Sequence, residues 1–234
     1  MLVLVAGHHD KTARDLAALW APWGATILTC GDLSVAGWRH LLNDPEDSEV
    51  VIDGQTVAAR EIMGVLTRLP CVPEGELRRV VPEDRAYVAV EMTSFLLSWL
   101  AGLRCPVLNR PTPTCLTGPG WRHEQWVYAG AHLRIPVEPV VWNLNCEAGL
   151  PEGKSAPADT TVTVVGRRCL GTADSMLVAY ARRLARAAGV DLLAVRFMKT
   201  EAGFRLHGAD PWVDISLAEV TDAILEHFCE ASRC

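Results

Sequence analysis

Short apolar runs alternate with helical patterns along the first hundred residues. The runs at 2–6, 25–30 and 62–70 are typical of strands, and a helical pattern with Asp10 as its N-cap follows the first of them. Residues 84–103 form a long stretch that would be apolar nearly all round as a helix. Strands and helices that alternate over short connections predict an α/β unit with a largely parallel sheet.

The second half of the chain carries a different pattern. A helix is predicted over 121–133, and residues 143–160 are rich in turn formers without periodicity, which predicts a flexible connection. An alternating strand at 161–168 and an amphipathic helix that ends at Gly189 come next. Residues 192–212 then show two apolar runs around a polar turn, which predicts a β-hairpin.

Two further turn and cap signals are readable. Asp53 and Gly54 lie between two strand-like runs, which predicts a hairpin there. The last helix is predicted to begin with a capping box made by Ser216 and Glu219. Its apolar positions are expected to be buried; they are Leu217, Val220, Ile224 and Phe228.

Composition narrows the class of protein. The chain has 234 residues, half of them apolar, and a net charge of −6, which argues against a general nucleic-acid or anionic-membrane binder. The first residues lack a positive charge before their short apolar run, and no run approaches the length of a membrane span, so we expect a cytoplasmic protein. The eight cysteines are dispersed without a close pair, which gives no zinc motif.

Familiar catalytic motifs are absent from the chain. It has no GxGxxG, GxxxxGK[ST], GxSxG or HExxH pattern. His8 and His9 follow the first predicted strand, at the sheet edge where α/β proteins often bind ligands. Adjacent residues on a strand point to opposite faces, so one metal ion rarely takes both, and we favour two histidines at a loop edge.

Four segments, in a fixed order over residues 1–137, carry a resemblance to a known family. The matching positions are Asp10 at the first helix start, Arg68 and Pro70, the Asn109–Arg110–Pro111 signature, and Gln125, Ala129 and Pro136 in and after the helix at 121–133. In this order the segments resemble the ATP-grasp ligases, in particular those that act on ribosomal peptides such as microviridin precursors. Arg122 stands where that family has a lysine.

The resemblance implies an ATP-grasp-like α/β fold. It would comprise an N-terminal α/β domain with a largely parallel sheet, residues 1–113, and a reduced C-terminal α+β remnant, residues 114–234. Where a complete relative has its nucleotide-binding lobe, this chain has only residues 143–160, which lack the apolar residues of a core. Lysines for phosphate binding are also scarce, since the chain has Lys11, Lys154 and Lys199 alone.

In that family the hairpin at 192–212 holds magnesium with an Asp on its first strand and a Glu-x-Asn-Pro on its second. The corresponding alignment puts Arg196 at the Asp, His207 at the Glu and Ala209 at the Asn. A guanidinium repels Mg²⁺ and an alanine supplies no ligand. Asp210 is then the one carboxylate nearby, so no metal is expected here.

These departures favour a degenerate ATP-grasp-like protein, a pseudoenzyme that uses no ATP or Mg²⁺ cofactor. We expect it to bind a peptide, a protein or a small metabolite in a peptide-modification or specialised-metabolism pathway, with no nucleic-acid or membrane partner, and to dimerise through the helix at 84–103. An active ATP- and Mg²⁺-dependent carboxylate–amine ligase with a reduced nucleotide site is the alternative. A new activity that uses His207, Asp210, the His8–His9 pair or a cysteine is a third hypothesis. The candidate ligand-binding residues are His8, His9, Arg68, Asn109, Arg110, Arg122, Arg196, His207 and Asp210.

Overall fold

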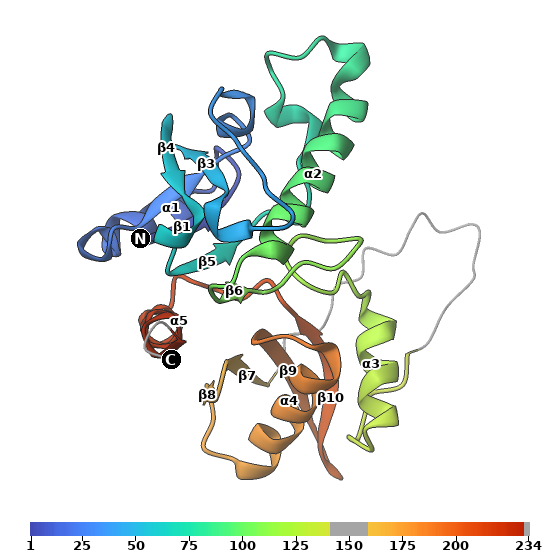
Figure 1. The fold of residues 1–234 in the computed structure, drawn as a ribbon. Helices are drawn as coiled ribbons and strands as arrows, with labels where there is room; N and C mark the ends of the chain where they lie inside the picture. The colour runs from blue at the N-terminus through green and yellow to red at the C-terminus, as the bar shows by residue number, and fades with distance from the viewer. Residues whose placement is uncertain (141–158, 232–234) are drawn as a thin grey trace.

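Two four-stranded sheets form the framework of the chain (Figure 1). The structure is a computed structural model, and it describes residues 1–140 and 159–231. The first sheet has the order β2-β1-β5-β6 and all its strands are parallel, as the sequence predicts. Its strands are β1 (Leu2–Val5), β2 (Thr26–Leu28), β5 (Gly64–Thr67) and β6 (Val107–Leu108).

The second sheet is antiparallel and has the order β10-β9-β7-β8. It contains the predicted hairpin as its longest pair. Its strands are β7 (Thr160–Val165), β8 (Arg168–Leu170), β9 (Leu192–Thr200) and β10 (Gly203–Asp210). A separate hairpin confirms the turn predicted at Asp53 and Gly54; it pairs β3 (Glu49–Ile52) with β4 (Gln55–Ala58).

Five α-helices are described, with predicted caps at two of them. The Asp10 carboxylate accepts a hydrogen bond from the Ala13 N–H (3.0 Å) at the start of the first helix, and Gly189 ends the fourth with φ +67°. The helices are α1 (Lys11–Leu19), α2 (Arg85–Gly102), α3 (His123–His132), α4 (Ser175–Ala188) and α5 (Ala218–Ala231). Short 3-10 helices lie at Ala21–Trp23, Asp32–Ser34, Pro45–Asp47, Ala59–Glu61, Glu74–Glu76 and Pro82–Asp84.

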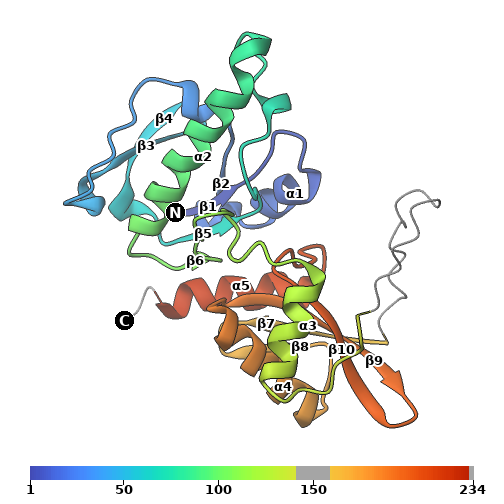
Figure 2. The same ribbon diagram turned by 90° about the vertical axis from the view of Figure 1, so that its right-hand side faces the viewer.

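The parallel sheet is buried on both faces. Val3 and Val65 pack with Trp99 of α2 on one face. Leu4 packs on the other face in a cluster that includes Ile224 of α5 and residues of α1. Figure 2 shows α5 between the two sheets, so the last helix of the chain completes the core of the first sheet. Since this core draws on residues before and after 113, the domain boundary at 113 stays a prediction.

One face of the antiparallel sheet is buried, and the other is covered by α5 at one end and open elsewhere. Side chains at alternate positions of β9, among them Val195 and Phe197, pack with Leu177 and Leu184 of α4 and with Trp126 of α3. Of the intervening positions of β9, Leu192 is buried, and those from Ala194 onward are partly exposed. α3 and α4 therefore cover the same side of this sheet, as Figure 2 shows.

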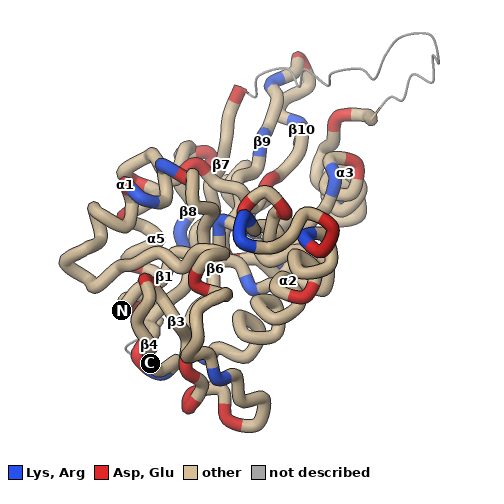
Figure 3. The backbone as a smooth tube through the Cα atoms, turned by 90° about the horizontal axis from the view of Figure 1, so that it is seen from above, with Lys and Arg blue, Asp and Glu red and all other residues tan. Residues whose placement is uncertain are grey.

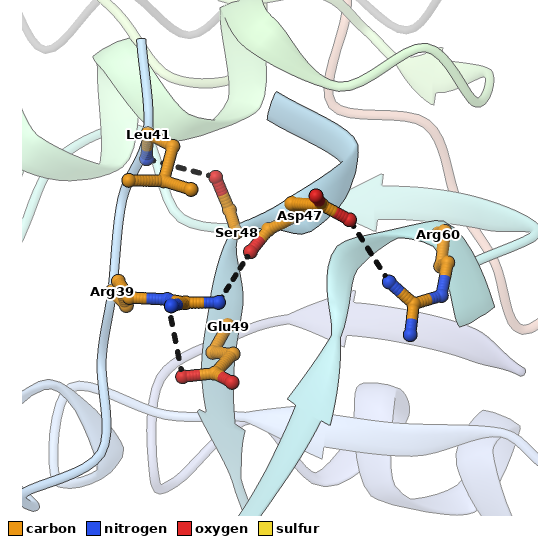
Figure 4. A network of polar contacts seen from close by, with 6 residues as sticks. All are labelled: Arg39, Leu41, Asp47, Ser48, Glu49 and Arg60. Atoms are coloured by element: carbon orange, nitrogen blue, oxygen red, sulfur yellow. Dashed lines mark hydrogen bonds and ion pairs between the residues drawn. The ribbon is translucent and has the colours of Figure 1, made fainter. Parts of the chain in front are cut away.

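The β3–β4 hairpin is tied to its surroundings by polar contacts (Figure 4). Arg39 lies 3.4 Å from the Glu49 carboxylate and donates to the Asp47 carbonyl (3.2 Å), while the Asp47 carboxylate accepts from Arg60 (3.0 Å). The Ser48 hydroxyl accepts from a backbone N–H (3.0 Å). The charged side chains are largely exposed, so each ion pair contributes little and the network is structural. Basic and acidic residues are spread over both halves of the chain (Figure 3).

The predicted start of the last helix is wrong. The hydroxyl and N–H of Ser216 donate to the Asp214 carboxylate at 2.7 and 2.9 Å, the helix begins at Ala218, and Leu217 is 47% exposed. The carboxylate two residues upstream competes for the serine and forms a local turn before the helix. The burial of Val220, Ile224 and Phe228 is confirmed.

Three other expectations concern segments rather than single contacts. The flexible connection at 143–160 lies outside the described residues except for its last two positions. Within the described ranges, no helix is both long and apolar enough to cross a membrane. Tyr87 and Val90 of α2 are 67% and 62% exposed, and the homodimer predicted through that helix stays a prediction.

Candidate functional site

The open face of the β9–β10 hairpin carries Arg196. Arg196 lies directly opposite Gly208, and the residues on either side of it, Val195 and Phe197, face the core. A Cβ atom on Gly208 would lie 3.0 Å from Nδ1 of His123 and 3.7 Å from Nη2 of Arg196. The guanidinium and the imidazole therefore occupy the space above Gly208 that a side chain there would need.

The Arg196 side chain has an unused donor. Its Nε atom is buried and has no hydrogen-bond partner among the described residues. An unsatisfied buried donor costs about 1–3 kcal/mol, more when the group is charged. A guanidinium offers donors only, in a planar arrangement that matches a carboxylate or a phosphate. The Arg196 guanidinium therefore lies beside Gly208 with one buried donor that has no partner among the described residues.

His207 lies beside this arginine in a β-bulge between Leu206 and Gly208. Its Nδ1 atom is 2.7 Å from a carboxylate oxygen of Glu138, and its ring centroid is 5.3 Å from that of His123. The His207 side chain is 12% exposed, and that of Glu138 is 42% exposed. The Glu138 carboxylate fixes the orientation of the His207 ring.

Sequence reasoning missed His123 and Glu138. His123 begins α3, and Glu138 lies in the segment that follows it, where its N–H bonds the Leu206 carbonyl (3.0 Å). Both residues lie far before the hairpin in sequence, Glu138 being 69 positions before His207, and neither stands in a recognisable motif. Only the docking of α3 and the segment after it against β10 brings them to the site.

A bulge changes the side-chain alternation along the second hairpin strand by one residue. Ala209 is 6% exposed, lies in the core and pairs with Val195, whereas Asp210 pairs with Ala194 on the partly exposed side. The bulge at His207 shifts the alternation of side chains along β10. Gly208 and Asp210, rather than His207 and Ala209, therefore share the open face with Arg196.

The magnesium and nucleotide implied by the resemblance do not fit the residues of this face. A hard divalent cation takes several oxygen ligands, usually from more than one carboxylate. Here Arg196 and Gly208 supply none, and the Asp210 carboxylate already accepts from the Trp212 N–H (2.8 Å). No group of three or more His, Cys, Asp or Glu that could hold a metal ion is found within 1–140 and 159–231.

Arg68 lies near the end of β10 in a satisfied pair. Its Nε donates to the Asp10 carboxylate at 2.9 Å, with the two side chains only 10% and 15% exposed. Its guanidinium carbon lies 4.4 Å from the centroid of the Trp212 ring, and Nη1 donates to the Val213 carbonyl (3.4 Å). Arg68 therefore connects β5 to the start of α1 and to the segment after β10.

Asn109 is a structural connector between the sheets. It is 2% exposed, and its Oδ1 accepts from the N–H groups of Asp191 (3.1 Å) and Leu192 (2.7 Å). Its Nδ2 donates to the carbonyls of Leu192 (2.8 Å) and Thr117 (3.4 Å). These four bonds use the hydrogen-bonding capacity of the amide, so Asn109 has none left for a ligand.

Arg110 and Arg122 hold helix ends. The guanidinium of Arg110 donates to the carbonyls of Leu103 (3.0 Å) and Cys105 (3.2 Å) beyond the last turn of α2. Arg122 is exposed at the N-cap of α3, where its N–H donates to Oε1 of Gln125 (2.8 Å). Neither residue lies on the hairpin that carries Arg196.

His8 and His9 lie at a different site, after β1. Both are exposed, and their ring centroids are 5.0 Å apart. The His8 N–H donates to the Glu76 carboxylate (3.0 Å), and His9 Nε2 is 3.2 Å from Nη2 of Arg78. They line a shallow pocket of about 200 Å³ at the carboxyl ends of β1 and β2. Of the nine candidates, the structure thus brings only Arg196, His207 and Asp210 together on the hairpin.

Two cysteines are unsuited to act as nucleophiles. Burial, with a smaller effect of the nearby Glu76 carboxylate, raises the pKa of the Cys30 thiol to about 12. Burial also raises the pKa of Cys105 to about 11, against the opposing effect of the Arg110 charge. The reactive form of a cysteine is the thiolate, which both environments disfavour.

The fold is that of the ATP-grasp ligases, as the four sequence segments indicate. No family model and no curated protein sequence matches this chain. Solved structures of peptide macrocyclases and related ligases superpose on it over nearly their full length, at identities that establish the fold alone.

Three of these structures are particularly informative. Macrocyclase MdnC from Microcystis aeruginosa MRC, bound with precursor peptide MdnA, gives a TM-score of 0.67 at 10% identity and covers 98% of this chain and 100% of its own. ATP-grasp ligase PsnB, complexed with a phosphomimetic variant of its minimal precursor, Mg and ADP, gives 0.65 at 12% identity, with coverage of 97% and 98%. A RiPP-associated ATP-grasp ligase from Chryseobacterium gregarium gives 0.62 at 12% identity, with coverage of 98% and 96%.

Proposed function

We propose that this chain is an ATP-grasp-fold binding protein that recognises a carboxylate-bearing peptide and does not use Mg·ATP. The observation that carries the proposal is the buried, unpartnered Nε of Arg196 above Gly208. Charge-assisted hydrogen bonds contribute about 1.5–3 kcal/mol each. A carboxylate that accepts from the Arg196 Nε would add one such bond to the free energy of binding.

The residues around Arg196 suit such a ligand. His207, oriented by Glu138, and His123 add neutral or positive donors next to the guanidinium. These side chains bind and orient an acidic group; no chemical step is assigned to them.

A peptide is the ligand class that the neighbours support. MdnC was crystallised with precursor peptide MdnA, and PsnB with precursor peptide PsnA2. A protein of the same fold that binds a peptide without acyl-phosphate chemistry would serve as an accessory protein in a peptide-modification or specialised-metabolism pathway.

An active ATP-dependent carboxylate–amine ligase is the second candidate. Two observations favour it: the near full-length likeness to PsnB, which was crystallised with Mg and ADP, and the position of Asp210 on the open face. This candidate requires that Mg·ATP bind and that ADP be released with a peptide substrate.

Thermal unfolding with two probes separates the candidates. The first probe is the tetrapeptide acetyl-Asp-Glu-Asp-Glu-amide, compared with its Asn-Gln-Asn-Gln counterpart; the second is Mg·ATP. At a hundred times Kd a ligand stabilises by about 2.7 kcal/mol, which raises the Tm of a chain of this size by about 5–10 °C. We expect that rise with the acidic peptide alone, and its loss in Arg196→Gln.

Lys199→Gln is the matched control. It removes the same charge from the same strand, at a position whose side chain alternates to the other side of the sheet. Equal loss of peptide binding in both variants, or an equal response to the amide peptide, would refute recognition by Arg196. A Tm rise with Mg·ATP, together with ADP release, would establish the ligase instead.

A further inference from the structure

A groove on the other side of the second sheet gathers three arginines. Its volume is about 460 Å³, and it runs along the end of β7 and the last turns of α4. Arg167, Arg182 and Arg186 line it together with His227 and one acidic residue, Asp191. Positive charge therefore exceeds negative charge in this groove, within a chain whose net charge is −6.

The three arginines have no acidic partner. None of them lies in an ion pair within the described part of the chain. Arg182 and Arg186 are one helical turn apart on α4, a spacing at which like charges repel by about 0.2–0.5 kcal/mol. Arg182 also donates to the Arg167 carbonyl (2.8 Å), which fixes its guanidinium beside the β7–β8 turn.

Two arginines lie just outside the groove. Arg168, next in sequence to Arg167, forms an ion pair with Glu226, and Arg183, next to Arg182, donates to the Leu133 carbonyl. Arg182 and Arg183 thus both donate to a backbone carbonyl, and of these neighbouring arginines Arg168 is the one in an ion pair among the described residues.

The remaining lining of the groove is apolar. Val164, Ala185 and Val190 contribute to its wall. Its volume lies in the range of small-molecule sites, about 300–1,000 Å³. Arginine is the residue best suited to hold a phosphate group through paired hydrogen bonds, and the aliphatic side chains offer contact to a nonpolar group next to it.

From this combination we infer that the groove binds a small molecule in which a phosphate monoester is attached to an apolar body. The site is separate from the one at Arg196. Val164 belongs to the core that α4 covers, while Arg196 alternates to the opposite side of the sheet. The inference therefore does not depend on the proposed function.

Phenyl phosphate is the probe, and isothermal titration calorimetry is the measurement. We expect saturable binding of one molecule per chain, tighter than that of inorganic phosphate because the ring contacts the apolar wall. Arg186→Gln and Arg167→Gln should each weaken binding at least about tenfold, a loss of about 1.4 kcal/mol. Arg183→Gln, on the same helix but outside the groove, should leave the affinity within about twofold.

Three results would overturn the inference. Equal affinity for inorganic and phenyl phosphate would show that the groove does not recognise an apolar group next to the phosphate. An equal loss of affinity in Arg183→Gln would show that binding depends on overall charge and not on the groove arginines. Tighter binding of a phosphoserine peptide would make the partner a phosphorylated protein. The Tm of each variant shows whether it is folded. Arg186→Gln and Arg167→Gln test the groove independently, so one of them is sufficient if the other does not fold.

Discussion

Replacement of Asn109 by alanine is the most direct test of how the two sheets are joined. The Asn109 side chain follows β6 in the parallel sheet and reaches Leu192 at the start of β9 in the antiparallel sheet. Asn109→Ala removes the amide and all four of its hydrogen bonds. We therefore expect a loss of stability rather than a loss of ligand binding.

The size of the loss follows from the groups left behind. Leu192 is 3% exposed, so its N–H and its carbonyl lose their partners where water has little access. Each orphaned buried group costs about 1–3 kcal/mol, which gives about 4 kcal/mol for the two. For a chain of this length that corresponds to a fall in Tm of about 8–16 °C.

Urea unfolding followed by circular dichroism measures the loss, with Asn43→Ala, at an exposed position, as the matched control. The control should change the free energy of unfolding by less than about 0.5 kcal/mol. A loss below about 1 kcal/mol in Asn109→Ala, combined with lost binding of the acidic tetrapeptide, would contradict the structural role and return Asn109 to the ligand site.

Three further predictions concern the core, a thiol and a histidine. Gly64→Ala places a Cβ 2.4 Å from Cδ1 of the buried Phe228 and should destabilise by about 1–3 kcal/mol; a double-mutant cycle with Phe228→Leu should show coupling, and strict additivity would contradict the contact. Cys30, with a pKa of about 12 against an ordinary 9.0, has about a thousandfold less thiolate near pH 8 than an ordinary thiol, so iodoacetamide should label the exposed Cys71 first, as peptide mass spectrometry would show. Burial lowers the pKa of His40 below 6.5, so the unfolded state binds its proton more readily, and the stability present above about pH 6.5 is lost as pH falls through the folded-state pKa. In His40→Asn the urea midpoint should depend less on pH between about pH 7.5 and 5. An unchanged slope of the midpoint against pH would contradict this assignment.

Local features of the fold were predictable because they depend on neighbours in sequence. Asp10 caps α1, Gly189 ends α4 in the left-handed conformation that glycine adopts readily, and the β9–β10 hairpin lies where its alternation and turn indicate. The Ser216 prediction failed at the same level, because Asp214 competes for the same hydroxyl. Such competition between two nearby side chains is hard to rank from sequence.

Some residues of the candidate site were also predictable from the sequence, whereas others depend on tertiary packing. Arg196 and the scarcity of carboxylates on the hairpin are readable from the sequence, and they motivated the expectation of a degenerate site. The one-residue shift that brings Asp210 to the open face required the bulge, which depends on pairing between two strands. His123 and Glu138 entered only through the packing of α3 and the segment after it.

The sequence by itself determined the kinds of element, their order, and the chemical types available on the hairpin, since these follow from backbone periodicity and residue identity. The tertiary structure alone decided that α5 fills the core of the first sheet, that Asn109 and Arg68 are used in structural contacts, and that three arginines gather around one groove. The physical reason is that burial and hydrogen-bond satisfaction depend on groups far apart in the chain, whose meeting is set by packing of the whole core.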